Sequence, residues 1–407
     1  MKKIDSYRDV VGDQIIDELY LIGRQLNGVS VQNINTTRYG GGVAEILNMM
    51  VPLMNDLGVD VWWDVLEGDA RFFEITKKMH NGLHGSEVDL SKDDLAYFLE
   101  VNRRNETLIK RWGEIVFVHD PQPVGLIRQK RRLKNKWIWR CHVDFSRPQK
   151  NIWAFLKKFV EKYNLSVFSA SAFAKKVNVP QILISPSIDP LSDKNRELDL
   201  GFIDQVLNKY NIDKNKPLIT QVSRFDYLKD PVGVIKAYKL VKKYIDCQLV
   251  LAGGGAADDP EGQKVLDEVM EAAAEDKDIF VLHLPADSHL EINALQRAST
   301  VVLQKSLREG FGLTVTEALW KERPVIASGV GGIPLQIAHK YSGILTYTVE
   351  GTAYWIKQLI QEPEYAAQLG INGKKHVKNN FLITRHIQDY LLLFLSLYKP
   401  EEVVRIG

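Results

Sequence analysis

The sequence has 407 residues, of which 45% are hydrophobic and 26% are charged, and its formal net charge is +2. These values are typical of a globular protein and exclude a disordered or coiled-coil chain, while the small net charge gives no support to a nucleic-acid partner. At about 150 residues per domain, a chain of this length is expected to form two or three domains, and we take two as the working number.

The two cysteines and the ends of the chain bear on location. Cys141 and Cys247 both lie in apolar runs, so we predict free thiols, no disulfide framework and a reducing, cytoplasmic compartment. The first fourteen residues are charged and resemble no signal peptide. The apolar run from Leu391 to Tyr398 is far shorter than the roughly 20 residues that span a bilayer, so we predict no membrane association.

The chain begins with a predicted helix around Val10 to Leu26 and a strand over Ser30 to Asn35. A glycine loop follows, Arg38-Tyr39-Gly40-Gly41-Gly42-Val43-Ala44-Glu45, and then an amphipathic helix to Leu57. This is not the G-x-G-x-x-G dinucleotide fingerprint. From these residues alone, a simple turn and a loop that binds a phosphate or a sugar are equally favoured. If the loop binds a ligand, Gly41 and Gly42 are the residues expected to contact it.

Apolar runs predict five more strands in the first half, with helical stretches between them. They cover Val59 to Leu66, Ile115 to His119, Trp137 to Val143, Ser166 to Ser169 and Ile182 to Ser185. This alternation is typical of a parallel sheet wrapped by helices, in which ligands bind at the carboxyl ends of the strands. Asp120 follows one of these strands and His142 lies at the end of another, so we predict that Asp120 accepts a hydrogen bond from a sugar hydroxyl and that His142 donates one.

A polar segment, Asp189 to Asn195, interrupts the pattern and predicts a domain boundary. The second half repeats the alternation, with strands over Leu218 to Ser223, Cys247 to Ala252, Ile279 to Leu284, Val301 to Gln304, Pro324 to Ala327 and Gly343 to Thr346. We therefore predict two Rossmann-like α/β domains facing each other across a cleft, residues 1–188 and 189–381. A final helix over Thr384 to Leu397 is expected to return to the first domain, so that residues 382–407 complete it.

Two cations follow the first strand of the second half. Arg224 and Lys229 lie just beyond Ser223, and Pro231 is well placed to begin a helix. A planar guanidinium and an ammonium at the end of a strand can converge on one anion, and a leaving diphosphate needs such cations because it gains negative charge as its bond to sugar breaks.

The stretch from Lys305 to Leu319 reads as a glycine turn that opens a helix near Gly312 to Thr314. Such a turn brings backbone N–H groups and the positive end of the helix dipole to a phosphate, and Gly310, Phe311, Gly312 and Leu313 are its candidate contacts. Glu309 and Glu317 frame the turn, and carboxylates accept hydrogen bonds from sugar hydroxyls. This combination predicts a site for a nucleotide sugar.

Other patterns give weaker indications. A basic run over residues 128–136 is interpreted as a solvated helix face. His80 and His84 are spaced like zinc ligands but lack a following glutamate, so no metal site is predicted. Asp276 and Asp278 precede a strand and are expected at the wrong edge of the sheet. Residues 329–334 form either a second backbone-donor loop for the diphosphate or a plain turn.

Taken together, these residues resemble the retaining glycosyltransferases of the GT-B fold, glycosyltransferase family 4. The match includes Arg224 and Lys229 with Glu309 and Glu317. It extends to the sequences at 40–45, 67–68, 119–123, 139–144 and 258–262, which look like those of trehalose synthases of the glycosyltransferring type. The likeness runs from about residue 31 to residue 392.

The resemblance implies a role for each matching residue. Arg224 and Lys229 would hold the diphosphate, Glu309 the hydroxyls of the donor glucose and Glu317 the ribose. His142 would contact the donor sugar and assist transfer, and Asp120 would face the acceptor glucose. Gly41 and Gly42 would line the loop beside the phosphate. Relatives often carry an acidic residue after Gly-Gly-Ile-Pro, whereas Leu335 and Gln336 follow Pro334 here.

The expected activity is transfer of glucose from a nucleoside-diphosphate glucose to free glucose, giving α,α-trehalose in a reversible reaction without a metal or other cofactor. A homodimer is a further expectation. Three alternatives stay open: a trehalose phosphorylase that uses inorganic phosphate, a non-catalytic sugar or nucleotide sensor, and a Rossmann dehydrogenase, which the missing dinucleotide fingerprint disfavours. The preferred nucleoside and the physiological direction do not follow from the sequence.

Overall fold

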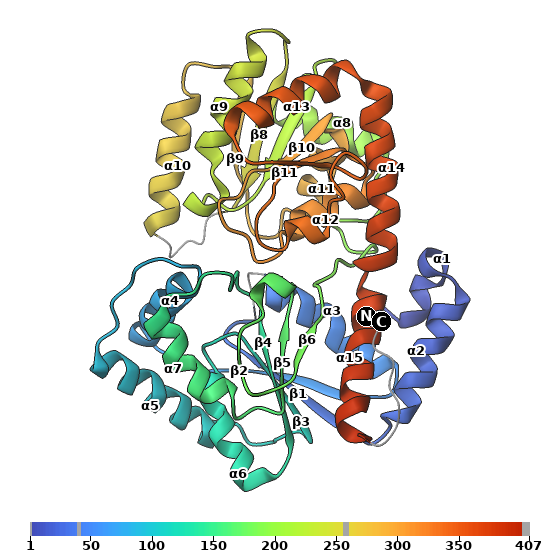
Figure 1. Cartoon of the computed structure of the whole chain (residues 1–407). Coiled ribbons are helices and arrows are strands. Elements are labelled where there is room, and N and C mark those ends of the chain that lie inside the picture. The colour runs from blue at the N-terminus through green and yellow to red at the C-terminus, as the bar shows by residue number, and fades with distance from the viewer. Residues whose placement is uncertain (1, 39–41, 255–259, 401–407) are drawn as a thin grey trace. The chain divides into compact units, whose positions relative to one another are not determined.

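The computed structural model describes residues 2–38, 42–254 and 260–400 (Figure 1). The chain forms two compact units: unit 1 comprises Met1–Ser187 with Ile383–Gly407, and unit 2 comprises Ile188–Leu382. The sequence prediction had divided the chain at 188/189 and again at 381/382, one residue from each of these boundaries. Each unit is built around a six-stranded parallel sheet.

Unit 1 contains six strands, helices on both faces of its sheet, and the last helix of the chain. In chain order these are η1 (Ile4–Tyr7), α1 (Arg8–Val11), α2 (Asp13–Gln25), β1 (Ser30–Asn35), α3 (Gly42–Asp56), β2 (Asp60–Val65), α4 (Ala70–Leu83), α5 (Lys92–Leu108), β3 (Ile115–His119), η2 (Val124–Gln129), α6 (Lys130–Leu133), β4 (Lys136–Cys141), α7 (Lys150–Val160), β5 (Leu165–Phe168), η3 (Ser171–Phe173), β6 (Gln181–Leu183) and α15 (Ile383–Tyr398).

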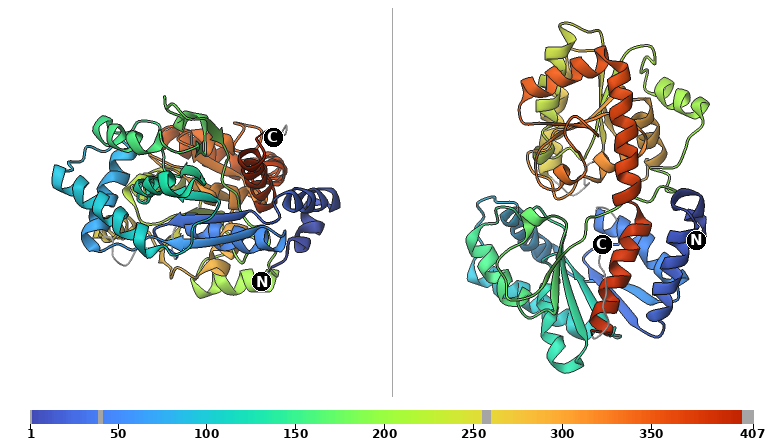
Figure 2. Two further views of the ribbon diagram at one scale, coloured as in Figure 1. Left: turned by 90° about the horizontal axis from the view of Figure 1, so that it is seen from below. Right: turned by 45° about the vertical axis from the view of Figure 1, so that its right-hand side comes forward.

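The strand order in unit 1 is β2-β1-β3-β4-β5-β6, so the order reverses between β1 and β3. Helices α4, α5 and α7 cover one face of the sheet, and their apolar side chains form a core with Trp137 and Trp139 of β4 (Figure 1). On the other face α15 packs beside α2, as the red and dark blue helices in the right-hand view of Figure 2 show. The predicted return of the last helix to the first domain agrees with this packing.

Unit 2 repeats the alternation of strand and helix. Its elements are α8 (Leu200–Lys209), β7 (Leu218–Val222), η4 (Tyr227–Lys229), α9 (Pro231–Lys242), β8 (Gln248–Gly253), α10 (Pro260–Ala273), β9 (Ile279–His283), α11 (His289–Ala298), β10 (Val301–Gln304), α12 (Leu313–Trp320), β11 (Val325–Ser328), η5 (Ile333–Leu335), β12 (Ile344–Thr346), α13 (Val349–Gln361) and α14 (Pro363–Asn380).

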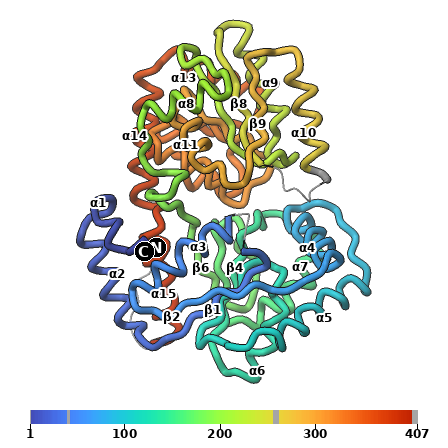
Figure 3. Tube along the Cα trace, turned by 180° about the vertical axis from the view of Figure 1, so that it is seen from behind, coloured from blue at the N-terminus to red at the C-terminus, as the bar shows by residue number. Residues whose placement is uncertain are grey.

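The strand order in unit 2 is β12-β11-β10-β7-β8-β9, and it reverses between β7 and β10. One core lies under α9, α10, α13 and α14, and a second lies under α8 and α11, which are neighbours in the view of Figure 3. Because the strands are buried on both faces, they read as continuous apolar runs, which is why the sequence revealed them. Helix α9 begins as predicted, with Pro231 at its first position and the Asp230 carboxylate accepting from the N–H of Gly233.

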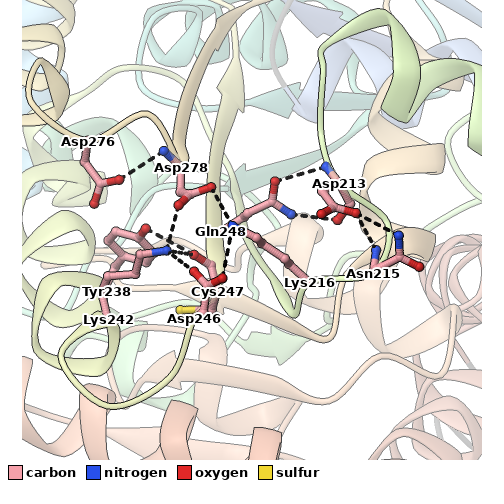
Figure 4. Close-up of polar contacts among 10 residues, drawn as sticks. All are labelled: Asp213, Asn215, Lys216, Tyr238, Lys242, Asp246, Cys247, Gln248, Asp276 and Asp278. Carbon is pink, nitrogen blue, oxygen red and sulfur yellow. Dashed lines mark hydrogen bonds and ion pairs between the residues drawn. The ribbon is translucent and has the colours of Figure 1, made fainter.

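The amino edge of this sheet carries ion pairs and hydrogen bonds (Figure 4). The Lys242 ammonium lies 2.7 Å from Asp278 and 2.6 Å from Asp246, and Lys216 reaches the same two carboxylates. These pairs hold the pKa of both Asp246 and Asp278 below its ordinary value. Asp276 and Asp278 therefore lie at the edge where the sequence placed them, away from the carboxyl ends of the strands, and Asp278 belongs to a structural cluster.

Some predicted elements differ in extent. Strand β4 ends at Cys141, two residues earlier than predicted, so His142 begins the following loop. The basic run over 128–136 is not one helix face: η2 ends at Gln129, α6 has only four residues, and Lys134 adopts a left-handed backbone conformation that stops the helix. No helix within the described ranges is long and apolar enough to cross a membrane.

Candidate functional site

The carboxyl edge of the unit 2 sheet brings together two segments that are far apart in the sequence. Strands β7 and β10 are parallel neighbours, with Ile219 opposite Val301. The loops that follow them therefore start side by side, at the point where the strand order reverses. Open α/β sheets bind ligands at such a point. The loop after β7 carries Arg224 and Lys229, and the loop after β10 carries Glu309.

Lys229 and Glu309 form an ion pair at this edge, with the lysine Nζ 2.5 Å from the glutamate Oε2. The two side chains are 18% and 10% exposed, so the pair is shielded but still within reach of solvent. Both parts of the sequence prediction, a cation after β7 and a carboxylate after β10, meet here. An ammonium has three hydrogens to donate, so Lys229 can contact an anion while it stays near Glu309.

The Glu309 carboxylate is held in place through one of its oxygens. Oε2 also accepts from Ser306 Oγ at 3.0 Å and from Gln304 Nε2 at 3.4 Å. Gln304 is in turn fixed by Thr314 Oγ1, which donates to its Oε1 at 2.8 Å. Within the described part of the chain no donor contacts Glu309 Oε1. This oxygen can therefore accept a hydrogen bond from a bound hydroxyl.

Helix α12 opens next to this carboxylate, as the glycine turn predicted. Gly312 precedes the helix with a φ of 85°, and a side chain there would lie 3.2 Å from Cγ of Glu309. As a glycine, Gly312 has no side chain with which to cap the helix. The first N–H groups of a helix lack intrahelical partners, and the positive end of its dipole attracts anions. Leu313 is the first helical residue, so the turn presents backbone donors beside Lys229 and Glu309.

The loop over 329–332 supports the backbone of this turn. The N–H of Gly332 donates to the carbonyl oxygen of Glu309 at 3.3 Å. Gly331 has a φ of 57°, and a Cβ there would lie 1.6 Å from the same oxygen. Only glycine fits such an approach. The loop was predicted to be either a donor for the diphosphate or a turn, and the N–H of Gly332 is engaged in holding Glu309.

Gln336 and Phe311 form the base of the turn. Gln336 is fully buried, and its Nε2 donates to the carbonyl oxygen of Phe311 at 2.5 Å. The Phe311 ring is 5% exposed and packs edge-on against Phe381 at 5.5 Å between centroids. The neutral amide of Gln336 thus stabilises the loop by donating a hydrogen bond that a carboxylate cannot donate.

Arg224 is the more exposed of the two predicted phosphate ligands. Its side chain is 63% exposed, and its Nη2 lies 3.3 Å from Asp226 Oδ2. Asp226 also accepts from the N–H of Leu228, which fixes the short helix η4 that ends at Lys229. The backbone of this loop is therefore ordered, while most of the guanidinium remains available to a ligand.

Glu317 lies in the second turn of α12 and is 3% exposed. The nearby Lys321 ammonium is also buried and donates to Asn195 Oδ1, Gln296 Oε1 and the Glu317 carbonyl oxygen at 3.1, 2.8 and 3.1 Å. Burial lowers the pKa of Lys321 to about 7, although the Glu317 carboxylate opposes that change. Glu317 is thus further from solvent than Glu309.

In unit 1, Asp120 and His142 meet at the carboxyl edge of neighbouring strands β3 and β4. Asp120 adopts a left-handed backbone with a φ of 65°, and its Oδ1 accepts from the backbone N–H of His142 at 2.8 Å. Burial raises the pKa of Asp120 to about 6, against the opposing effects of this hydrogen bond and of Arg140. The hydrogen bond to the backbone of His142 therefore fixes the orientation of the Asp120 carboxyl group.

Both ring nitrogens of His142 already have protein partners. Nε2 lies 3.0 Å from Nδ1 of His119, and Arg140 Nε lies 3.4 Å from His142 Nδ1. Burial, with Arg140, His119 and His386 adding to it, lowers the pKa of His142 well below its ordinary value. A hydrogen bond donated from this ring to a sugar, as the sequence predicted, would have to replace one of these contacts.

The remaining predicted residues are Gly41 and Gly42. Gly42 is the exposed first residue of α3, whereas Gly41 lies outside the described residues, as do Asp258 and Asp259 of the matching motifs. No cluster of three or more histidine, cysteine or acidic side chains suited to a metal occurs in the described ranges.

Several residues at these edges were not among the predicted site residues. They are Gln304, Ser306 and Gly331 in unit 2, and His119, Arg140 and Asn33 in unit 1. A sequence signal existed for some of them, because a polar residue at the last position of an apolar strand, such as Gln304 or His119, is unusual in a buried sheet. The residue that each of these side chains contacts could not be predicted from the same pattern.

Two family descriptions match the chain. Residues 33–175 match "Trehalose synthase, N-terminal domain", and residues 202–376 match "Glycosyl transferases group 1". The trehalose synthase of Thermococcus litoralis is 42% identical over 401 residues, which cover 97% of each chain. The trehalose phosphorylase of Pleurotus pulmonarius is 29% identical over 401 residues, which cover 84% of this chain but 54% of that protein.

The fold also matches solved structures. The UDP-forming α,α-trehalose-phosphate synthase of Burkholderia xenovorans, solved in complex with glucose-6-phosphate, superposes with a TM-score of 0.73. The match covers 89% of this chain and 99% of that one, at 12% sequence identity. A likeness at this identity establishes the fold, and the two α/β units have the GT-B architecture predicted from the sequence.

Proposed function

Because the chain belongs to the trehalose synthase family of glycosyltransferases, we propose that it transfers glucose from a nucleoside-diphosphate glucose to free glucose, giving α,α-trehalose and the nucleoside diphosphate. The configuration at the anomeric carbon is retained. The observation that carries the proposal is the Lys229–Glu309 pair beside the uncapped start of α12, which combines an anion site with an acceptor for hydroxyl groups.

Unit 2 binds the donor. Lys229, Arg224 and the first N–H groups of α12 contact the diphosphate, and Oε1 of Glu309 accepts a hydrogen bond from a hydroxyl of the glucosyl group. Glu317 serves the ribose. The cations neutralise the charge that develops on the leaving diphosphate, so the proposal includes no resident metal. The diphosphate binds where a preorganised positive charge is already in place.

The reaction needs no protein nucleophile. The acceptor hydroxyl attacks the anomeric carbon on the face from which the diphosphate departs; the bond from that carbon to the phosphate oxygen breaks, and the same oxygen takes the hydroxyl proton. In unit 1, His142 contacts the donor sugar and Asp120 the acceptor glucose. With its pKa raised to about 6, the Asp120 carboxyl sits near the range in which it can share a proton with a hydroxyl.

A phosphorylase is the second candidate, because a trehalose phosphorylase is among the relatives. The chain spans about half the length of that protein, whereas it spans 97% of the trehalose synthase from Thermococcus litoralis. Coverage and identity both favour the transferase that uses a nucleotide donor.

The test is incubation of the protein with UDP-, ADP-, GDP- and TDP-glucose and free glucose, followed by chromatography and NMR of the product. We expect α,α-trehalose with at least one donor, and cleavage of trehalose by a nucleoside diphosphate but not by inorganic phosphate. Cleavage by phosphate alone would establish the phosphorylase. Binding of the nucleotide sugar without turnover would indicate a sensor and would contradict the proposal.

A further inference from the structure

A chain of buried hydrogen bonds runs from Arg140 through His142 and His119 to Asn33. Three of its four members are almost completely buried: Arg140 is 0%, His119 is 2% and Asn33 is 4% exposed. They come from β4, β3 and β1, and the ring of His119 stacks on that of His142 with centroids 5.3 Å apart. The contacts within this series of side chains determine which ring nitrogens of His119 and His142 carry a hydrogen.

The donor and acceptor of each of these hydrogen bonds follow from the two residues at the ends of the series, Asn33 and Arg140. At one end Asn33 Oδ1 lies 3.0 Å from His119 Nε2, and the Asn33 amide nitrogen points to the carbonyl oxygen of Trp62. An amide oxygen can only accept, so His119 Nε2 carries a hydrogen. In a neutral imidazole the other nitrogen is then a lone-pair acceptor, and His119 Nδ1 must receive its hydrogen from His142 Nε2.

The other end gives the same answer independently. An arginine Nε–H can only donate, and Arg140 Nε faces His142 Nδ1 at 3.4 Å. His142 Nδ1 is therefore an acceptor and Nε2 a donor. The reverse tautomer would place two lone pairs against each other between the rings and two hydrogens against each other at Arg140. A protonated His142 would place a cation against the guanidinium.

We propose that His119 and Arg140 are positioning residues that hold His142 as the neutral tautomer with its hydrogen on Nε2. His142 then offers Nδ1 alone, as an acceptor, so that a sugar hydroxyl donates to it. The 3.4 Å contact with Arg140 is long, which leaves room for a hydroxyl to share that lone pair. The inference rests on the proposed function only for the role of His142 toward sugar; the tautomer itself does not depend on it.

Other charged and titratable groups face His142 from the elements around it. Asp120 follows β3 and binds the His142 backbone, and His386 comes from α15 and donates to or accepts from Ser187 Oγ at 2.9 Å. His386 adds to the effects that keep His142 neutral but does not hydrogen-bond its ring. It is therefore a matched control, a buried histidine of the same unit outside the chain of hydrogen bonds.

The test uses the full-length protein with ¹⁵N-labelled histidine. Two-bond ¹H–¹⁵N correlation distinguishes ring nitrogens that carry a hydrogen from those that do not, and loss of a signal in His142→Gln assigns the residue. At neutral pH we expect His142 and His119 both as Nε2–H tautomers. In His119→Asn, whose amide oxygen replaces Nδ1 as acceptor, His142 keeps its tautomer. In His119→Phe the long 3.4 Å contact with Arg140 is the remaining constraint, and His142 becomes a mixture of tautomers. A wild-type His142 that is protonated or has its hydrogen on Nδ1 would overturn the proposal.

Turnover provides the second arm. His119→Phe is expected to lower kcat by about 10- to 100-fold, the range found where a supporting group orients a reactive histidine, with little change in the KM of the nucleotide sugar. His119→Asn restores most of the rate, and the control His386→Phe keeps it. A folded His119→Phe variant with wild-type kcat would contradict the positioning role. If no trehalose is formed by any variant, the proposed function fails, and the spectra still decide the tautomer.

Discussion

At the carboxyl edge of the unit 1 sheet, the imidazoles of His119 and His142 are hydrogen-bonded to each other. At the same edge of the unit 2 sheet, the Lys229 ammonium is paired with the Glu309 carboxylate. Burial explains the difference. Neutral rings can be enclosed almost completely when their polar atoms are bonded, and His119 is 2% exposed. Lys229 and Glu309 keep 18% and 10% of their side-chain surface, since removing charges from water is costly even when they are paired.

The difference separates two kinds of task. An ion pair near solvent can exchange one partner for a charged ligand, because the ammonium loses little when a phosphate oxygen takes the place of water or carboxylate. The imidazoles of the buried hydrogen-bond chain cannot take up a proton without losing a hydrogen bond, but the chain fixes the orientation of a ring. In this comparison unit 2 is suited to exchanging an ion-pair partner for an anion, and unit 1 is suited to holding groups in a single geometry.

Removing the charge from unit 2 should have the largest effect. Lys229→Met is expected to lower kcat/KM by about 10²- to 10³-fold, because one preorganised donor to the developing charge on the diphosphate is lost. Steady-state kinetics with nucleotide sugar and glucose measures it, with circular dichroism to confirm the fold.

Lys242→Met is the matched control. Lys242 belongs to the same unit and is ion-paired at 2.7 Å with Asp278, and its side chain is 24% exposed, but it lies at the amino edge of the sheet (Figure 4). We expect it to lose stability without losing activity per folded molecule. Equal losses of turnover in the two variants would mean that the Lys229–Glu309 pair is structural.

A change in the supporting loop should have the next largest effect. In Gly331→Ala the new Cβ would lie 1.6 Å from the Glu309 carbonyl oxygen, so the turn must move. A displacement of about 1 Å at a reacting group lowers rates by about 10²-fold, and we expect a loss of that size in kcat.

Gly58→Ala controls for backbone strain in that experiment. Gly58 has a φ of 87°, but its Cβ would meet nothing within 4 Å. This variant carries the cost of a left-handed alanine, ~1 kcal/mol of stability, and should keep its activity. A Gly331→Ala protein that is as active as Gly58→Ala would show that the geometry of Glu309 is not set by this loop.

These glycines also show how far sequence reasoning extends. Strands β3 and β10 have the predicted bounds because strands buried on both faces are apolar runs between polar turns. Strand β1 also has the predicted bounds, although its sequence Ser-Val-Gln-Asn-Ile-Asn is mostly polar. The glycine turn and the start of α12 followed from residue type in the same local way. The role of Gly331 did not, since its constraint is the carbonyl oxygen of Glu309, a residue from another loop.

Partners across strands are the part that local patterns leave open. Lys229 meets Glu309 because β7 and β10 are adjacent, and His119 meets His142 because β3 and β4 are adjacent. Strand order depends on how helices cross over the sheet, and periodicity carries no record of it. Lys229 and Glu309 were both predicted as site residues. His119 and Arg140 were not, because the role of a buried polar residue depends on which residue it contacts.

Acid should affect unit 1 before unit 2. Burial lowers the pKa of His119 to about 3 and holds those of His142 and His386 well below the ordinary value of 6.5. Below pH 6.5 the unfolded chain therefore binds protons that the folded unit does not, and stability falls as the pH falls. Asp120, whose pKa is raised to about 6, acts in the opposite sense below that pH, as does Asp389.

The three histidines therefore outnumber the two aspartates that act against them, and we expect the stability of unit 1 to fall as the pH falls from 6 to 4. Asp246 and Asp278 of unit 2 have lowered pKa values, so their contribution is retained until the pH falls below 3.8. Urea unfolding followed at pH 6.5, 5.5 and 4.5 measures the slope of stability against pH, and His386→Phe should make that slope shallower. A slope of zero would contradict the buried neutral imidazoles.

The smallest effect is expected for Arg224→Lys. Its guanidinium is 63% exposed, and its one ion pair within the described residues is the 3.3 Å contact with Asp226, so it is oriented far less than Lys229. Lysine keeps the charge but replaces the planar fork with a point charge. Loss of one charge-assisted hydrogen bond, ~1.5 kcal/mol, predicts about a tenfold rise in the KM of the nucleotide sugar with a smaller change in kcat.

Arg196→Lys, an exposed arginine of unit 2 paired with Asp193 at 2.7 Å, is the control and should leave KM unchanged. If Arg224→Lys instead matched Lys229→Met in lost kcat/KM, the distinction between a fixed and a mobile cation at this edge would be wrong, and both would act as one preorganised clamp.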